Sequence, residues 1–152
     1  EPFAVILADD LCDCNEKSVI SQMIEIYSQH QCSVVAIEEV PMNQTHKYGV
    51  IAGKLVKNSI NTYQVSDMVE KPKEKDAPSN MAIIGRYILT PDIFNILENI
   101  KPDKSGEIQI TDALNIQAKQ GKVVAYKFKG KRFDCGSVKG YLEANNYFAK
   151  NL

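Results

Sequence analysis

An acidic and a basic side chain stand together in the stretch QVSDMVEKP, where Glu70 and Lys71 precede Pro72 at the end of a predicted strand. A lysine ammonium is a compact charge that suits phosphate oxygens, whereas a carboxylate accepts hydrogen bonds from hydroxyl groups. The pair could therefore hold the two ends of a phosphorylated, hydroxyl-rich molecule such as a sugar phosphate. Taken alone, it could equally be an exposed ion pair of little energetic consequence.

Aspartates stand at two further strand ends. Asp9 and Asp10 follow the apolar run Phe3–Ala8, and Asp134 lies in RFDCG, just before a glycine turn and a predicted helix. Ligands of open α/β sheets bind beyond the carboxyl ends of the strands, and Mg²⁺ prefers carboxylate oxygens there. The simpler alternatives are a solvated or helix-capping pair for the first two residues. For the third, the alternative is an acid that complements a helix dipole.

Two other segments contain candidate residues. Tyr48 and Gly49 open a predicted strand, and the glycine would permit close approach of a ligand or form a β-bulge. In the stretch GEIQITDA, Thr111 and Asp112 resemble a helix start, so we expect capping and loop-fixing roles there. The sequence contains no Ser/His/Asp arrangement and no glycine-rich loop that could cradle a phosphate.

The elements that must position these residues begin with a strand, a helix and a strand. The continuous apolar run Phe3–Ala8 predicts a strand buried on both faces, as in a parallel sheet. Residues 17–30 have the apolar spacing of an amphipathic helix, and Cys32–Val40 is rich in β-branched residues. The three elements predict a right-handed βαβ unit.

The rest of the chain predicts antiparallel strands followed by alternating helices and strands. KYGVIAGKLV and TYQVSDMVEKP form an antiparallel pair, and Met81–Leu89 forms a strand. One helix is expected to begin at Thr90 as N-cap and run to about Asn99, and another to run from Thr111 to near Gly121. The strand KVVAYKFKG and a final helix capped by Ser137 complete a single layered α/β domain.

Composition narrows the class of protein. The chain has 152 residues and a net charge of −1, with 44% hydrophobic and 24% charged residues, as in ordinary globular proteins. The basic residues are scattered, so we expect no nucleic-acid partner, and no apolar run is long enough to cross a membrane. The four cysteines are expected to be free thiols, which favours a cytoplasmic location. Because the chain starts within a strand and without Met, we expect it to be part of a larger protein.

Six motifs occur in the order LADD, KYGVI, VEKP, APSNMAIIGRYIL, GEIQITDAL and KRFDCGSVKGYL. In this order they resemble the sugar-nucleotide pyrophosphorylases, over essentially all 152 residues. The resemblance is greatest to the uridylyltransferases that act on glucose 1-phosphate. It implies a Rossmann-like nucleotidyltransferase fold, in which a mixed sheet has flanking helices and a small antiparallel insertion. It also implies that UTP and glucose 1-phosphate give UDP-glucose and pyrophosphate, with Mg²⁺ as cofactor.

The resemblance also assigns roles to residues. Asp9 and Asp134 match the two metal-binding aspartates, Lys71 matches the lysine that contacts the sugar phosphate, and Glu70 matches the acid that binds the sugar hydroxyls. The implied catalytic residues are Asp9, Lys71 and Asp134. The implied substrate-binding residues are Gly49, Glu70, Lys71 and Ile83.

The chain departs from the family pattern in one respect. The family begins with a glycine-rich loop, GxGTRxxP, that cradles the triphosphate, and has a segment that reads the uracil; neither occurs here. We therefore expect residues 1–152 to be the sugar- and metal-binding C-terminal portion of one nucleotidyltransferase domain, incomplete at its N-terminal side. Two alternatives remain: a non-catalytic assembly module, or a relative of the thymidylyltransferases. The resemblance further implies a homo-oligomer.

Overall fold

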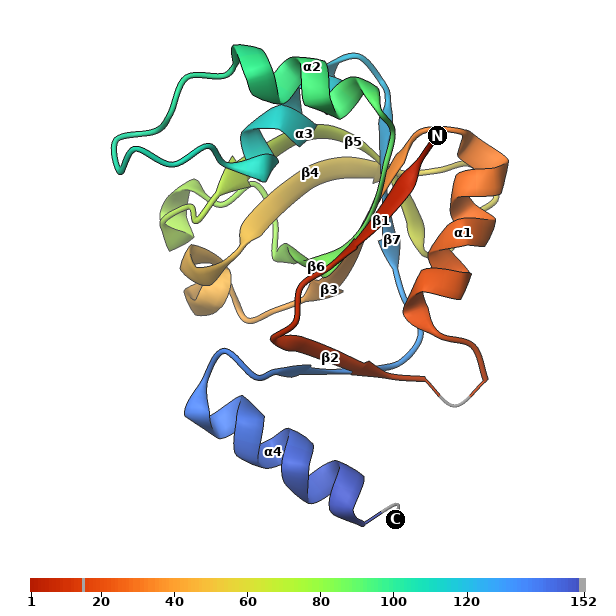
Figure 1. Ribbon diagram of the computed structural model, residues 1–152, viewed down its shortest axis with the longest axis vertical. Coiled ribbons are helices and arrows are strands. Elements are labelled where there is room, and N and C mark those ends of the chain that lie inside the picture. Colours follow the sequence, from red (N-terminus) through yellow and green to blue (C-terminus); the bar gives the residue numbers. More distant parts are fainter. Residues whose placement is uncertain (15, 151–152) are drawn as a thin grey trace.

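The computed structural model describes residues 1–14 and 16–150. A six-stranded mixed sheet forms its centre, with helices on both faces, and a two-stranded sheet with one helix lies below it (Figure 1). The strands are β1 Phe3–Ile6, β2 Asp10–Asp13, β3 Ser33–Glu39, β4 Gly49–Leu55, β5 Thr62–Glu70, β6 Met81–Leu89, β7 Val123–Lys127 and β8 Lys131–Asp134. The helices are α1 Val19–His30, α2 Asp92–Asn99, α3 Ile110–Lys119 and α4 Val138–Ala149, with short 3₁₀ turns at Met42–Lys47 and Glu74–Asp76.

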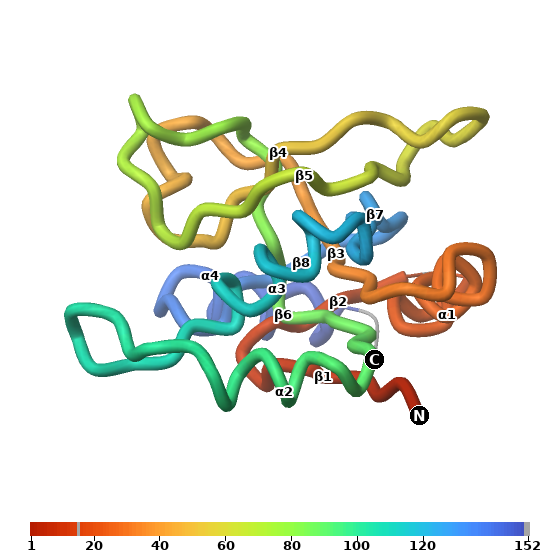
Figure 2. The backbone as a smooth tube through the Cα atoms, turned by 90° about the horizontal axis from the view of Figure 1, so that it is seen from above, coloured from red at the N-terminus to blue at the C-terminus, as the bar shows by residue number. Residues whose placement is uncertain are grey.

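The large sheet has the strand order β1-β6-β3-β7-β5-β4. Neighbours β3 and β7 are parallel, and the other neighbours pair antiparallel. Seen from above, the β4–β5 pair lies at one side of the molecule, and β1 with α2 lies at the other (Figure 2). A further pairing of β4 with β6 curls the sheet back at Val50 and Ala82. The expected mixed α/β architecture with an antiparallel β4–β5 pair is confirmed.

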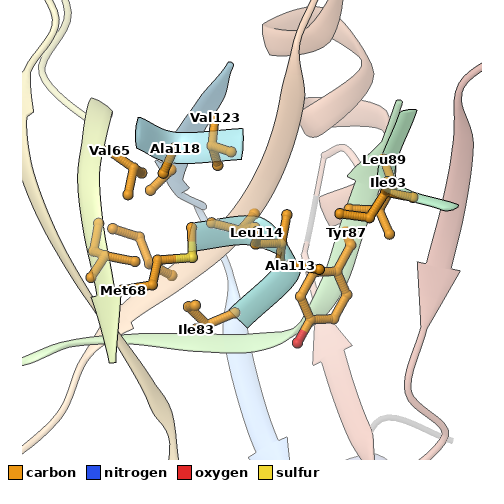
Figure 3. Close-up of a cluster of buried hydrophobic side chains, with 14 residues drawn as sticks. Val65, Met68, Ile83, Tyr87, Leu89, Ile93, Ala113, Leu114, Ala118 and Val123 are labelled. Atoms are coloured by element: carbon orange, nitrogen blue, oxygen red, sulfur yellow. The ribbon is translucent and has the colours of Figure 1, made fainter. Parts of the chain in front are cut away.

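Apolar clusters on the two faces of the sheet hold the helices in place. Successive residues of a strand point to opposite faces, so Val34 and Val35 of β3 belong to different clusters. Val34 packs with Met23 of α1, whereas Val35 belongs to the cluster that contains Ile93 of α2 and Leu114 of α3 (Figure 3). The cluster that contains Val35 also includes Ile83 and Tyr87, which line the cavity described below.

The predicted topology of the first strand was wrong. β1 pairs antiparallel with β6 at the edge of the sheet, and partly buried and exposed residues alternate along it. β6 also pairs antiparallel with β3, so it separates the two strands of the expected βαβ unit. A continuous apolar run indicates a strand but does not identify its neighbour, and this explains the error.

A small sheet, not predicted from the sequence, links the two ends of the chain. β2 and β8 pair antiparallel, and α4 packs against β8. Ser137 caps α4 as predicted, because its hydroxyl accepts a hydrogen bond from the Gly140 amide at 3.0 Å. Asp134, the last residue of β8, therefore lies just before the capped start of α4.

Helix starts elsewhere differ from the prediction. Pro91, rather than Thr90, is the N-cap of α2, and the Thr90 hydroxyl lies 3.1 Å from that of Ser33 and accepts a 3.1 Å hydrogen bond from the Gln117 side chain. The four cysteines are free, as expected. Within the described residues no helix combines the length and the apolar character needed to cross a membrane.

Candidate functional site

A cavity of about 380 Å³ lies among β4, β5, β6, β8 and the start of α3. The six residues to which the family resemblance assigns a role all line it: Asp9, Gly49, Glu70, Lys71, Ile83 and Asp134. They come from segments scattered over most of the chain, and each stands at or near the end of a strand, apart from Ile83 within β6. The structure thus gathers in one cavity the side chains that could bind a cation, a phosphate and hydroxyl groups.

Strand register explains how the cavity is assembled. The β4–β5 register places Gly49 opposite Glu70, and the β2–β8 register places Asp10 opposite Asp134. The extra β4–β6 pairing brings Ile83 against Gly49. Since a shift of one residue would turn each side chain to the other face, these registers fix the composition of the site.

One end of the cavity is acidic. A methyl group added to Gly136 would lie 3.0 Å from Oδ2 of Asp9 and 3.2 Å from Oδ1 of Asp134, so the two carboxylates converge on the same turn. The Cys135 amide donates to the Asp9 carbonyl at 2.7 Å, which holds the two segments together. Two carboxylates are a donor set that Mg²⁺ accepts, because it usually keeps several waters or phosphate oxygens. The described residues offer no group of three or more His, Cys, Asp or Glu that could hold a metal.

Asp10, by contrast, serves the scaffold. It is buried, its Oδ2 accepts the Gly85 amide at 2.7 Å, and its Oδ1 is paired with the guanidinium of Arg132. Arg132 also donates to Glu38 at 2.6 Å. Burial opposes the charge of Arg132, but the hydrogen bonds to these carboxylates raise its pKa well above the usual range. The arginine therefore remains a fixed cation beside the acidic end.

Tyr48, not predicted to take part, connects the two ends of the cavity. Its hydroxyl donates to Oδ2 of Asp134 at 3.1 Å, and its carbonyl accepts the Lys71 amide at 2.9 Å. The Arg132 guanidinium lies 5.1 Å from the centre of its ring, within the range of a cation–π contact. Burial raises the pKa of the Tyr48 phenol, so the hydroxyl keeps its proton and its donor role at neutral pH. The adjacency to Gly49 was the signal that could have identified it.

The opposite end of the cavity is built around Glu70. Thr111 donates to Glu70 Oε2 at 2.5 Å, which corrects the helix-capping role expected for this threonine. A methyl group on Gly49 would lie 2.9 Å from Thr111 Oγ1 and 3.2 Å from both Glu70 Oε2 and Ile83 Cδ1. The absence of a side chain at residue 49 therefore exposes backbone next to a carboxylate, a surface suited to hydroxyl groups.

Lys71 lines the cavity because its backbone does not continue the strand, in which neighbouring side chains would point to opposite faces. β5 ends at Glu70, and Lys71 has a φ of 45°, in the left-handed region that side-chain-bearing residues seldom adopt. Both side chains consequently line the same cavity instead of opposite faces, with Lys71 Nζ 3.9 Å from Glu70 Oε1. Such strain persists where the surroundings impose it, often at functional sites.

A larger cavity, of about 690 Å³, lies between β8 and the start of α1. Three of its charged side chains already have protein partners: Lys17 pairs with Glu25, and Asp13 accepts the Tyr147 hydroxyl at 2.6 Å. The smaller cavity, with its cation, carboxylates and exposed backbone, is therefore the candidate functional site.

Comparison with known proteins gives close relatives over the whole chain. A "UTP--glucose-1-phosphate uridylyltransferase" from Pseudomonas aeruginosa is 61% identical over 153 aligned residues, covering 100% of this chain and 54% of the relative. A protein of the same name from Staphylococcus epidermidis is 42% identical and covers 98% of this chain and 51% of the relative. The chain thus spans about half the length of the curated relatives it matches.

Comparison with solved structures gives the same kind of relative. The "Crystal Structure of UDP-glucose pyrophosphorylase complexed with UDP-glucose" has a TM-score of 0.94 and 59% identity, covering 100% of this chain and 57% of that one. The family model described as "Nucleotidyl transferase" matches residues 1–151. Together with the mixed sheet and the gathered site residues, this match shows that the chain belongs to the nucleotidyl transferase family.

Proposed function

We propose that the chain forms the sugar-phosphate- and metal-binding portion of a UTP–glucose-1-phosphate uridylyltransferase, which makes UDP-glucose and pyrophosphate. One observation carries the proposal: a single cavity contains two converging carboxylates, a lysine beyond a strand end, and a carboxylate beside exposed backbone. The relatives that are 42–61% identical bear the name of this enzyme. Because the chain spans about half of them, we assign binding to this chain and turnover to the whole enzyme.

The sugar would lie at the Glu70 end. The carboxylate accepts hydrogen bonds from sugar hydroxyls, while Thr111 holds one of its oxygens in place. The backbone at Gly49 approaches the sugar ring, and the Ile83 side chain packs against it. These contacts would orient the ring so that its phosphate points toward Lys71.

The phosphate would lie between Lys71 and the acidic end. An oxygen of the sugar phosphate attacks the α-phosphorus of UTP, a new P–O bond forms, and pyrophosphate leaves with the electrons of the broken bond. Lys71 neutralises the attacking phosphate and fixes its direction, which lowers the barrier by positioning and by charge. Asp9 and Asp134 would hold Mg²⁺, which screens the repulsion between the two anionic substrates.

Two alternatives are less well supported. A thymidylyltransferase would use the same kind of cavity, but the relatives reported above are named uridylyltransferases. A pure assembly module would need no cavity of this composition. It predicts a concentration-dependent oligomer, measurable by light scattering, that does not bind sugar nucleotides.

The test is calorimetric titration of UDP-glucose into the chain, with and without Mg²⁺. We expect binding that strengthens with Mg²⁺ and weakens at least about tenfold in Lys71→Ala, because a charge-assisted contact to phosphate is lost. Lys73→Ala is the matched control, since Lys73 is exposed and does not line the cavity. No binding by a chain shown to be folded, or equal binding by the Lys71 variant, would refute the proposal.

A further inference from the structure

The two oxygens of the Asp134 carboxylate face different partners. Oδ1 accepts the Gly136 amide at 3.2 Å and points to the turn on which Asp9 converges. Oδ2 accepts the Tyr48 hydroxyl at 3.1 Å, and Arg132 Nη2 lies 3.8 Å from it. The hydroxyl of Tyr48 therefore binds one carboxylate oxygen while the other lies at the Gly136 turn, and the two contacts together fix the plane of the carboxylate.

The tyrosine is itself held from several sides. Its ring lies beneath the guanidinium of Arg132, whose other nitrogens are bound to Asp10 and Glu38. Its amide donates to the Thr45 carbonyl at 3.1 Å, so the preceding 3₁₀ turn fixes its backbone. A donor that is anchored in this way loses little freedom when it binds the carboxylate, so it can act as an orienting group.

The same residue also reaches the phosphate end of the cavity. Its carbonyl accepts the Lys71 amide at 2.9 Å, at the position where the backbone takes its left-handed turn. Tyr48 thus contacts one residue of the acidic pair through its side chain and the phosphate-binding lysine through its backbone. These two contacts are chemically separable, because a change of side chain leaves the carbonyl in place.

We propose that Tyr48 is a positioning residue whose hydroxyl orients Asp134 for binding a divalent cation, and which links that carboxylate to the backbone of Lys71. The proposal rests on the proposed function, since it takes Asp9 and Asp134 as the metal-binding pair. It adds a role for a residue to which the family resemblance assigned none. Groups that orient metal ligands typically change metal affinity by about 10- to 100-fold when they are removed.

The experiment compares Tyr48→Phe with Tyr147→Phe in the whole chain. Tyr147 is the matched control because its hydroxyl also donates to an aspartate, Asp13, at 2.6 Å, and it does not line the candidate site. Mn²⁺ is the probe, since it takes the same oxygen ligands as Mg²⁺ and the free ion is counted by electron paramagnetic resonance. Tyr48→Phe should weaken Mn²⁺ binding about tenfold, whereas Tyr147→Phe should change it less than about twofold.

A second readout separates the two contacts of Tyr48. Without metal, Tyr48→Phe should bind glucose 1-phosphate as the unsubstituted chain does, because the carbonyl still accepts the Lys71 amide. With metal present, the variant should bind it more weakly. In the unsubstituted chain, the ¹³Cζ resonance of Tyr48 should shift when Mg²⁺ is added, and that of Tyr147 should not; this measurement needs no variant to fold.

The outcomes distinguish this inference from the function on which it rests. Equal Mn²⁺ affinity in Tyr48→Phe and the unsubstituted chain, or equal losses in both tyrosine variants, would overturn the role of Tyr48 alone. A metal-free loss of glucose 1-phosphate binding would also overturn it, since the effect would then be a general disturbance of the cavity. If the unsubstituted chain binds no Mn²⁺, the assignment of Asp9 and Asp134 fails, and this proposal fails with it.

Discussion

The sharpest test of the structure is the substitution Gly140→Ala in the first turn of α4. A methyl group at this position would lie 1.9 Å from the carbonyl oxygen of Asp134 and 2.7 Å from its carbonyl carbon. Both atoms belong to the backbone of β8, so no side-chain rotation relieves the contact. The helix would have to move away from the strand that carries Asp134.

The sign of the expected effect follows from two opposing terms. Alanine favours a helix by about 1 kcal/mol over glycine, so propensity alone predicts stabilisation. Overpacking typically costs about 1–3 kcal/mol, and a backbone contact this short belongs at the upper end. The net prediction is a free energy of unfolding that is lower by about 2 kcal/mol.

Urea unfolding followed by circular dichroism measures this difference. The control is Asn146→Ala on the same helix, at an exposed position, which should stabilise by about 0.5 kcal/mol through propensity alone. Gly140→Ala should also weaken Mn²⁺ binding, because the displaced strand carries Asp134. If Gly140→Ala is as stable as the unsubstituted chain, the close approach of α4 to β8 is refuted.

Three further predictions concern the cavity. Arg132→Met should lower the free energy of unfolding by about 3–5 kcal/mol, because it leaves the buried Asp10 carboxylate without its cationic partner. Adding Asp10→Asn should recover part of that loss in the same urea assay, whereas additive losses would contradict the pairing. Burial and the nearby Glu70 and Asp10 carboxylates raise the pKa of Tyr87 from 10.0 to about 12. Above pH 10 the folded state therefore keeps a proton that the unfolded state loses. The contribution of Tyr87 to the free energy of unfolding is complete below pH 10 and declines above it. Relative to Tyr87→Phe, the chain should therefore lose about 1.3 kcal/mol between about pH 9 and pH 11, and a constant difference in the urea assay would contradict this. Lys71→Gly should raise the free energy of unfolding by about 0.5–1 kcal/mol by relieving the left-handed backbone, while calorimetry should show that glucose 1-phosphate binding is lost.

The positions of the six strands of the large sheet, and several residues that line the cavity, were predictable from the sequence. Apolar runs ended at charged residues, and strand ends are where ligands of such sheets bind, so Asp9, Glu70 and Asp134 could be singled out individually. The order of the motifs then identified the family. The structure adds the register that gathers these residues in one cavity.

The partners of the site residues were not predictable. The hydrogen bond from Thr111 to Glu70 joins residues 41 positions apart, and that from Tyr48 to Asp134 joins residues 86 positions apart. Neither pairing leaves a local pattern, because each depends on how β4 and α3 pack against the sheet. The left-handed conformation of Lys71 was hidden for a related reason: lysine has no preference for it, so only the surrounding fold imposes it.

The small β2–β8 sheet has a consequence for the order of folding. The ion pair between its two strands joins Asp10 to Arg132, which are 122 positions apart. Because closing so long a loop costs conformational entropy, we expect this sheet to form late. Its amides should open to hydrogen exchange as one unit with α4, while the large sheet stays closed. A cation bound by both Asp9 and Asp134 would stabilise the closed form of this unit. It would therefore slow hydrogen exchange in β2 and β8 and leave exchange in β3 unchanged.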